Sequence, residues 1–392
     1  MSDASRAKRI VYIILGLLAL GLIAYLLYSL FAAPGETPPQ ELPRISGRTI
    51  GGAPEAAPAG EQPARTPPLP DIPSIAEERL VRLADFPVIS PALNKDQSRV
   101  LYYKKDGGDL YSSDFSGKTR EKISNLTIIG LLEAIWNPIA ERAAVRYLDG
   151  DTLKSFLQIG TSSVAVLPQD ITGASWSPDG KSLAYLLPRE GGADLVIADP
   201  SGGNPRTAFR TPLVDADISW ITSDLIVFGT APSGLAEGYL FAFSRRDNSF
   251  NRLVGPAFGL TGLWSPDGTT ALLSSASRGG KKLILSSYDR AKNAAAPIPI
   301  ATLAEKCAWS GESAFCAVPR GIPAQTILPD DYLRGEFNPA DRIVAVDLKT
   351  GGISEVFNEG SFDVSDLVIT KDKKYLFFVN RADGTLWSLQ LR

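Results

Sequence analysis

The chain has 392 residues, with 40 Lys and Arg against 43 Asp and Glu, and its formal net charge is −3. A chain this close to neutral lacks the clustered positive charge that nucleic-acid binding requires. The chain has no His, which excludes His-ligated zinc, His-ligated haem and every Ser-His or Cys-His catalytic pair. Its two Cys cannot form a metal cage by themselves.

Residues 10–33 form an uncharged apolar run of 24 residues. At about 1.5 Å per residue, a helix of this length crosses a hydrocarbon core of about 30 Å. Arg6, Lys8 and Arg9 precede the run and the next basic residue is Arg44, so the positive-inside rule places residues 1–9 in the cytoplasm. We therefore predict a single-pass signal-anchor in the cell membrane, with everything after residue 33 outside. The alternative is a cleaved signal peptide, whose apolar region is shorter and ends in small residues.

Residues 34–75 contain eleven prolines among 42 residues, with Gly, Ala, Glu and Thr as most of the rest. Such a segment buries too little apolar surface to offset its ordering entropy. We predict a disordered extracytoplasmic linker that acts as a stalk. A Pro-rich docking motif is the alternative, although spacing of the PxxP kind arises by chance in this composition.

Tryptophan recurs through the remaining chain at a nearly constant interval. Trp136, Trp176, Trp220, Trp264 and Trp309 are separated by 40, 44, 44 and 45 residues, which is the period of propeller blades. Two copies carry the string Trp-Ser-Pro-Asp-Gly, beginning at Trp176 and Trp264. Two further copies without Trp begin near Ile89 and Ile369, which makes seven repeats.

Each repeat reads as four short antiparallel strands separated by turn residues, as in the Pro-Asp-Gly turn after Trp176. The last repeat supplies only three strands before the chain ends. Residues 78–83 resemble the fourth strands of other repeats, so we expect this segment to complete the last blade and close the ring. The sequence thus predicts an all-β, seven-bladed β-propeller over residues 78–392, preceded by a single transmembrane α-helix and the linker.

The Trp-Ser-Pro-Asp-Gly strings make residues 78–392 resemble the TolB-type, WD40-like propeller repeats of bacterial envelope proteins. The resemblance implies the blade structure. It leaves function open, because such propellers serve both as protein-binding platforms and as parts of peptidases.

Cys307 and Cys316 flank a tight turn in the sixth repeat. Aligning Trp309 with Trp176 places the two cysteines opposite each other on adjacent strands, within reach of a disulfide. An oxidising compartment outside the membrane favours that bond, and the alternative is two buried small side chains.

Acidic residues recur near the first strand of most blades, where loops surround one mouth of the central channel. An acidic ring there would bind a hard cation or select a basic partner, whereas the alternative is local hydrogen bonding in turns. The channel-mouth candidates are Asp85, Glu133, Asp170, Asp217, Glu305 and Asp366.

The sixth repeat is longer than the others, and the surplus falls between its second and third strands, at residues 318–340. Long loops on rigid scaffolds often carry recognition, and the alternative is a self-packed surface loop. The partner-binding candidates in this loop are Asp330, Asp331, Tyr332, Arg334, Glu336 and Phe337.

Neither a P-loop, nor a nucleophile elbow, nor a complete calcium loop occurs in the sequence. We therefore predict no catalytic residue, no cofactor and no metal site. The predicted function is a membrane-anchored module with a monomeric propeller that binds a protein or a cell-envelope polymer. The alternative is an extracytoplasmic glycan-acting enzyme, a glycoside hydrolase or lyase that uses channel carboxylates.

Overall fold

The computed structural model of the chain describes residues 79–391. The predicted cytoplasmic tail at residues 1–9, the span at 10–33 and the linker at 34–75 lie outside the described residues. Within residues 79–391, no helix is long and apolar enough to cross a bilayer.

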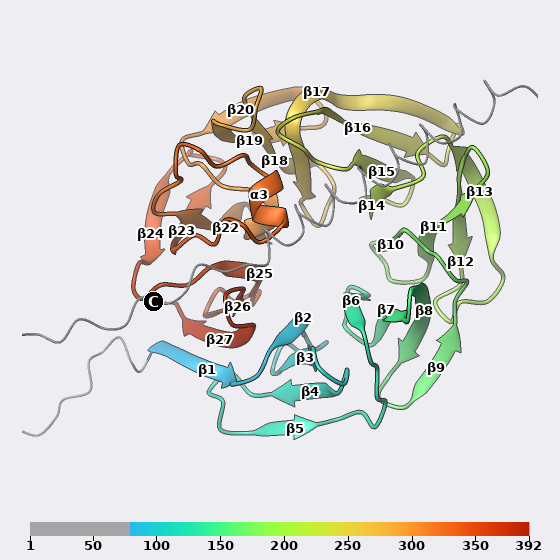
Figure 1. Cartoon of the computed structure of the whole chain (residues 1–392), viewed down its shortest axis with the longest axis horizontal. Helices are drawn as coiled ribbons and strands as arrows, with labels where there is room; N and C mark the ends of the chain where they lie inside the picture. Colours follow the sequence, from blue (N-terminus) through green and yellow to red (C-terminus); the bar gives the residue numbers. More distant parts are fainter. Residues whose placement is uncertain (1–78, 392) are drawn as a thin grey trace, which may run out of the picture. The chain divides into compact units, whose positions relative to one another are not determined.

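Seven antiparallel blades surround a common axis (Figure 1). Five are separate four-stranded sheets, and a seven-stranded sheet supplies the other two because its β17 serves both. The predicted all-β, seven-bladed propeller is therefore confirmed.

The blades follow one another in chain order. Blade 1 consists of β2 (Val88–Leu93), β3 (Val100–Lys104), β4 (Leu110–Ser113) and β5 (Arg120–Lys122). Blade 2 consists of β6 (Leu131–Trp136), β7 (Arg142–Asp149), β8 (Thr152–Ile159) and β9 (Ser163–Val166). Blade 3 consists of β10 (Gly173–Trp176), β11 (Leu183–Arg189), β12 (Gly192–Ala198) and β13 (Arg206–Thr211). Blades 4 and 5 consist of β14 (Ala216–Trp220), β15 (Leu225–Thr230), β16 (Glu237–Ser244), β17 (Ser249–Trp264), β18 (Thr270–Ala276), β19 (Leu283–Asp289) and β20 (Ala294–Ile298). Blade 6 consists of β21 (Cys307–Ser310), β22 (Ser313–Pro319), β23 (Asp341–Asp347) and β24 (Ile353–Phe357), and blade 7 of β25 (Val364–Ile369), β26 (Tyr375–Asn380), β27 (Thr385–Gln390) and β1 (Leu80–Ala84). Two short helices, η1 (Ala304–Lys306) and α3 (Asp330–Leu333), belong to the connections of blade 6.

Strand β17 is longer than the repeat pattern suggested, because it is both the outer strand of blade 4 and the inner strand of blade 5. Phe258 pairs with Glu237 of β16 on one side and with Ala276 of β18 on the other. The strand therefore passes from one blade to the next without a separate loop. Its ladders are irregular at the passage, where the Gly259 amide donates to the Ser233 carbonyl at 2.7 Å instead.

The repeated tryptophans link neighbouring blades. The indole Nε1 of Trp136 donates to the Ser90 carbonyl at 2.8 Å, and that of Trp176 donates to the Ile135 carbonyl at 2.8 Å. Trp309 makes the same contact with the Leu263 carbonyl at 3.2 Å. In each case the acceptor lies on the inner strand of the preceding blade, so the side chain combines apolar burial with a satisfied donor.

The Ser-Pro-Asp-Gly turns are fixed by their own side chains. Asp179 Oδ1 accepts a hydrogen bond from Ser177 Oγ at 2.7 Å, and Ser177 Oγ accepts one from the amide of Ser182 at 3.0 Å. Gly180 has φ of 68°, a conformation that other residues adopt at a cost. These contacts explain why the motif marks the turn between the first and second strands.

Strand β1 completes blade 7, where it pairs antiparallel with β27. The blade order is β1-β27-β26-β25, so the first strand of the propeller lies beside the last one. Leu83 and Ala84 are buried in the cluster that joins blades 7 and 1. This pairing covers the edge that β27 would otherwise expose.

The hydrophobic core is divided into clusters that lie between successive blades. The cluster between blades 5 and 6 contains Leu272, Leu285, Val344 and both cysteines. Cys307 and Cys316 are directly opposed in the pairing of β21 with β22 and are joined by a disulfide, as expected.

Candidate functional site

Four of the predicted acidic residues line the central channel. Glu133 of β6, Asp217 of β14 and Glu305 of η1 line a cavity of about 500 Å³, and Glu305 also lines a second cavity of about 700 Å³ together with Asp366 of β25. They come from blades 2, 4, 6 and 7, so the ring brings together residues that are far apart in the sequence.

The channel carboxylates have unequal surroundings. Glu133 forms an ion pair with Arg146 of β7. The side chains of Asp217 and Glu305 form no hydrogen bond or ion pair with any residue in 79–391, and the Asp366 carboxylate accepts only from the neighbouring Ser365 hydroxyl. The channel therefore holds more negative than positive side chains among the described residues.

Burial raises the pKa of Asp217, Glu305 and Asp366, although water reaches all three side chains through the channel. For Asp217 the negative charge of Glu133 adds to this rise in pKa and Arg146 opposes it. For Glu305 the positive charges of Lys306 and Arg381 oppose the rise in pKa, and the more weakly acting Asp217 and Asp366 add to it. Protein on several sides replaces part of their solvent, which disfavours the charged form. Perturbed carboxylates gathered in one cavity are typical of functional sites.

The other two acidic candidates lie away from these cavities. Asp85 forms an ion pair with Arg120 at 2.8 Å, and the hydrogen bond from Arg120 holds the Asp85 pKa below its ordinary value. Asp170 is exposed in the connection after β9, where its backbone has φ of 59°. The predicted ring is thus a partial one. Among the residues that the structure describes, no three His, Cys, Asp or Glu are grouped so as to hold a metal ion.

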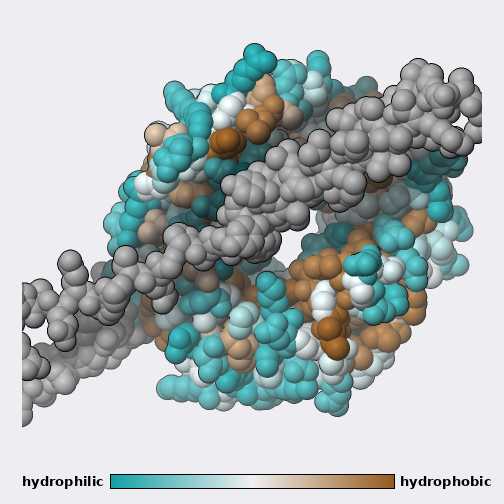
Figure 2. Space-filling model, in the orientation of Figure 1, coloured by the Kyte–Doolittle hydropathy of each residue, from teal (hydrophilic) through white to brown (hydrophobic). Residues whose placement is uncertain are grey.

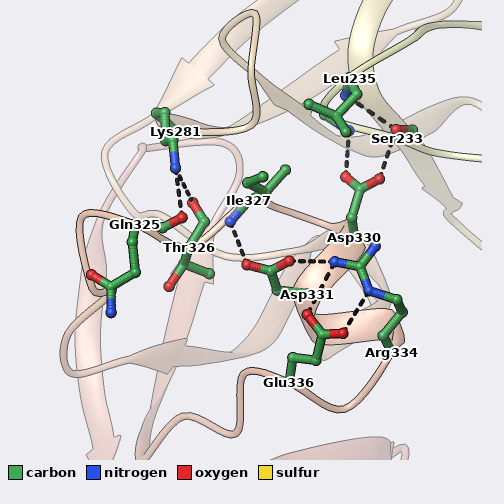
Figure 3. A network of polar contacts seen from close by, with 11 residues as sticks. Ser233, Leu235, Lys281, Gln325, Thr326, Ile327, Asp330, Asp331, Arg334 and Glu336 are labelled. Atoms are coloured by element: carbon green, nitrogen blue, oxygen red, sulfur yellow. Dashed lines mark hydrogen bonds and ion pairs between the residues drawn. The ribbon is translucent and has the colours of Figure 1, made fainter. Parts of the chain in front are cut away.

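The long connection of blade 6 spans residues 320–340 and is fastened to neighbouring blades. Asp330 accepts hydrogen bonds from Ser233 Oγ and the Gly234 amide, both at 2.7 Å (Figure 3). Lys281 Nζ donates to the Gln325 carbonyl at 2.6 Å. This loop thereby holds the connections of blades 4 and 5 and lies over the blade 6 side of the ring.

The partner-binding candidates in this loop divide into two groups. Asp330 and Asp331 are occupied by contacts within the protein. Asp330 accepts the two hydrogen bonds from Ser233 and Gly234, and Asp331 accepts from the Ile327 amide at 2.7 Å and from Arg334 at 2.6 Å. Arg334 also pairs with Glu336 at 3.0 Å, and both side chains are exposed. Phe337 packs against the small cluster beneath the loop.

Tyr332, one of the partner-binding candidates, is 5% exposed, so its side chain presents almost no surface to a partner. Its ring lies under the Arg381 guanidinium, 4.2 Å from the ring centroid. Its hydroxyl accepts a hydrogen bond from Lys306 Nζ at 3.3 Å, and burial raises its pKa to about 12. The loop is therefore self-packed at its centre and offers Leu333, Arg334 and Glu336 at its surface.

A buried ion triad holds this packing, and the sequence analysis did not identify it. Lys306 Nζ lies 2.8 Å from Asp341 Oδ2 and 2.8 Å from Asp363 Oδ1, and all three side chains are at most 2% exposed. Burial raises the Asp341 pKa to about 6. The available signal was a lysine directly before an apolar inner strand, a position where a charge requires buried partners.

An apolar patch lies on the same face as the loop. Strands alternate in direction, so the connections after second and fourth strands emerge on one face, which we term the channel face. Six large apolar side chains are exposed there, and Figure 2 shows apolar side chains gathered beside the central opening near β6 and β7. This channel-face patch comprises Ile129, Leu132, Leu148, Val214, Leu235 and Leu333.

No protein-family model and no curated protein matches the sequence. Among solved structures, an oligogalacturonate lyase in complex with manganese is 14% identical, with 81% of this chain and 94% of that chain covered and a TM-score of 0.58. The β-propeller domain of the Trilobed protease from Pyrococcus furiosus is 12% identical, with 77% and 95% covered and a TM-score of 0.54. TolB from Acinetobacter baumannii is 15% identical, with 70% and 64% covered and a TM-score of 0.46. The likeness to the first two shows the β-propeller fold alone.

Proposed function

We propose that this chain is a membrane-anchored binding module whose propeller recognises a protein or envelope polymer through the channel face. The observation that carries the proposal is the channel-face patch: exposed apolar side chains such as Ile129, 78% exposed, lie on the same face as a cavity lined by carboxylates, and Leu333 belongs to both. Exposed apolar side chains gathered on one face together with polar groups are typical of interaction sites.

The membrane tether is the second part of the proposal. It is supported by the uncharged run at residues 10–33 and by the basic residues before it. The propeller then lies outside the cell membrane, at the end of a stalk formed by residues 34–75. A protease added to intact cells should digest the propeller and spare a tag placed before residue 10. Protection of both ends would contradict this orientation.

Crosslinking in the native membrane tests the binding function directly. The full chain should capture a specific partner, and Leu132→Ser with Leu148→Ser should abolish the capture, because both side chains belong to the channel-face patch. Val166→Ser is the matched control, since Val166 is 86% exposed on β9, the outer strand of the same blade. Equal capture by all three proteins would contradict the proposal.

A glycan-acting enzyme is the second candidate, and the two channel carboxylates without partners favour it. Asp217 and Glu305 line one cavity, as an acid and a base would have to do. The fold likeness to oligogalacturonate lyase makes oligogalacturonate a sensible first substrate. Formation of unsaturated product by the chain, and its loss in Asp217→Asn, would establish this candidate, whereas no turnover of this substrate would exclude lyase activity on it.

A further inference from the structure

The channel-face patch and the carboxylate cavity lie on the same face of the propeller. Leu132 directly precedes Glu133, and Leu148 follows Arg146 by two residues, where Glu133 and Arg146 both line the cavity. Val214 and Leu235 each lie three residues from the cavity-lining residues Asp217 and Pro232. Leu333 itself lines the cavity. The other five patch residues therefore flank lining residues of the acidic cavity in the sequence, and we call the six apolar side chains the rim.

Backbone contacts hold this rim in place. The amide of Leu148 donates to the Gly130 carbonyl at 2.9 Å, which fixes the turn beside Ile129. The Val214 carbonyl accepts from Thr172 Oγ1 at 2.9 Å, and the Leu235 amide donates to Ser233 Oγ at 3.1 Å. A preformed rim lowers the ordering cost of binding.

The carboxylates of the cavity indicate the charge of a suitable partner. Glu133 already has Arg146 as its ion-pair partner. Neither Asp217 nor Glu305 forms an ion pair with a described residue, although Arg146 lies near Asp217, and Lys306 and Arg381 lie near Glu305. A bound cation placed between these two carboxylates would offset their mutual repulsion, and the partly desolvated setting would strengthen the attraction. An anionic polymer would instead meet like charge.

We infer that the channel face receives a protein segment that inserts a lysine or arginine side chain between Asp217 and Glu305 and packs its apolar neighbours on the patch. This inference rests on the proposed binding function and names the chemistry of the partner. Aliphatic side chains at the rim suit aliphatic residues of a peptide, and the acidic floor suits one cationic side chain. A Leu-Arg-Leu core is the simplest sequence with both features.

Peptide binding by the full chain in detergent tests this chemistry. The probes are end-blocked hexapeptides with a central Leu-Arg-Leu, and matched peptides with Leu-Glu-Leu, Leu-Gln-Leu or Gly-Arg-Gly at the centre. Calorimetry should show the Leu-Arg-Leu peptide binding at least about tenfold more tightly than each of the other three. Equal binding of the Leu-Glu-Leu peptide, or no binding of any peptide at millimolar concentration, would overturn the inference.

Variants locate the interaction. Asp217→Asn with Glu305→Gln, and separately Leu132→Ser with Leu148→Ser, should each weaken the Leu-Arg-Leu peptide at least about tenfold. Glu121→Gln on the outer strand β5 and Val166→Ser should leave its affinity unchanged, and circular dichroism should show that all variants are folded. Unchanged affinity in either double variant would overturn the inference.

Capture of the crosslinked partner by the two double variants tests this inference and the proposed function separately. Loss of capture in the leucine variant together with full capture in the carboxylate variant would keep the binding function and overturn the cationic insertion. Loss of capture in both variants would support both. Capture of an anionic glycan through this face would likewise overturn the inference and leave a binding function.

Discussion

At the scale of single residues, the channel carboxylates carry a cost in stability. Burial raises the pKa of Asp217 and Glu305, so the folded chain disfavours their charged forms. We predict that Asp217→Asn and Glu305→Gln each raise the free energy of unfolding at pH 7.5, by roughly 0.5 kcal/mol after allowance for solvent screening. Urea unfolding measures the change, and the gain should shrink as the pH falls toward about 4, because protonation removes the charge that the fold disfavours.

Asp179→Asn is the matched control for that prediction. Hydrogen bonds from Ser177 and the Lys181 amide hold the Asp179 pKa below its ordinary value, so its charge is favoured by the fold. This substitution should destabilise the propeller at pH 7.5. If both kinds of substitution destabilise, the channel carboxylates are structural rather than functional.

For the Lys306 triad we predict the opposite effect, a loss of stability when a charge is removed. Lys306→Met should reduce the free energy of unfolding by about 3–5 kcal/mol, because it leaves Asp341 and Asp363 buried without a cation. Adding Asp341→Asn and Asp363→Asn should recover at least half of this loss. Denaturant midpoints of the three proteins provide the measurement, and a loss below about 1 kcal/mol in Lys306→Met would contradict the role of the triad.

At the scale of elements, the loop at residues 320–340 depends on one carboxylate. Asp330→Ala removes two hydrogen bonds that join the loop to Ser233 and Gly234, and we expect a loss of about 1–3 kcal/mol. Hydrogen exchange should accelerate at residues 325–334 and stay unchanged in the sheets. Glu336→Ala is the control, since its exposed carboxylate contacts only Arg334. Equal exchange in both variants would show that the loop is held by apolar packing.

The pairing of β1 with β27 predicts how removal of β1 affects closure of the propeller ring. A chain that begins at Ile75 retains β1 and should be soluble and monomeric, whereas one that begins at Phe86 lacks it and exposes the edge of β27. We expect the shorter chain to melt at least about 10 °C lower or to aggregate, since it also loses the burial of Leu83 and Ala84. Equal melting temperatures would contradict the closure of the ring by β1.

The repeat pattern was sufficient to predict the blades because the tryptophans recur at one structural position, and the indoles of Trp136, Trp176 and Trp309 each donate to the inner strand of the preceding blade. The opposition of Cys307 to Cys316 followed from the same register. Long-range packing was beyond such reasoning. Nothing local to Tyr332 indicates that Lys306 and Arg381 enclose it, and nothing local to Asp85 indicates Arg120 as its partner. The site was therefore predictable as a ring of acidic residues, but its actual members depend on how the blades close.

At the scale of the whole molecule, the stability of the propeller should fall as pH rises from about 4 to about 6. Asp217, Glu305, Asp366 and Asp341 all have folded pKa values above their unfolded ones, that of Asp341 being about 6. In this window the folded chain binds more protons than the unfolded chain, so the free energy of unfolding decreases with rising pH. Carboxylates with lowered pKa values, such as Asp179 and Asp267, act in the opposite sense but only below about pH 4.

Above about pH 7 the curve should be flat to about pH 9, because the chain has no His to titrate there and both cysteines are in the disulfide. Urea midpoints of the chain beginning at Ile75, measured at pH 4.5, 6.0, 7.5 and 8.5, provide the test. Asp341→Asn should remove the largest single part of the slope, on the order of 1–3 kcal/mol, since its carboxylate is the most deeply buried of the four. A urea midpoint that rises between pH 4.5 and 6.0 would mean that ion pairs such as Lys306–Asp341 outweigh the burial of these carboxylates. The charged channel carboxylates would then stabilise the free propeller, which would argue against their being left unpaired for a cationic partner.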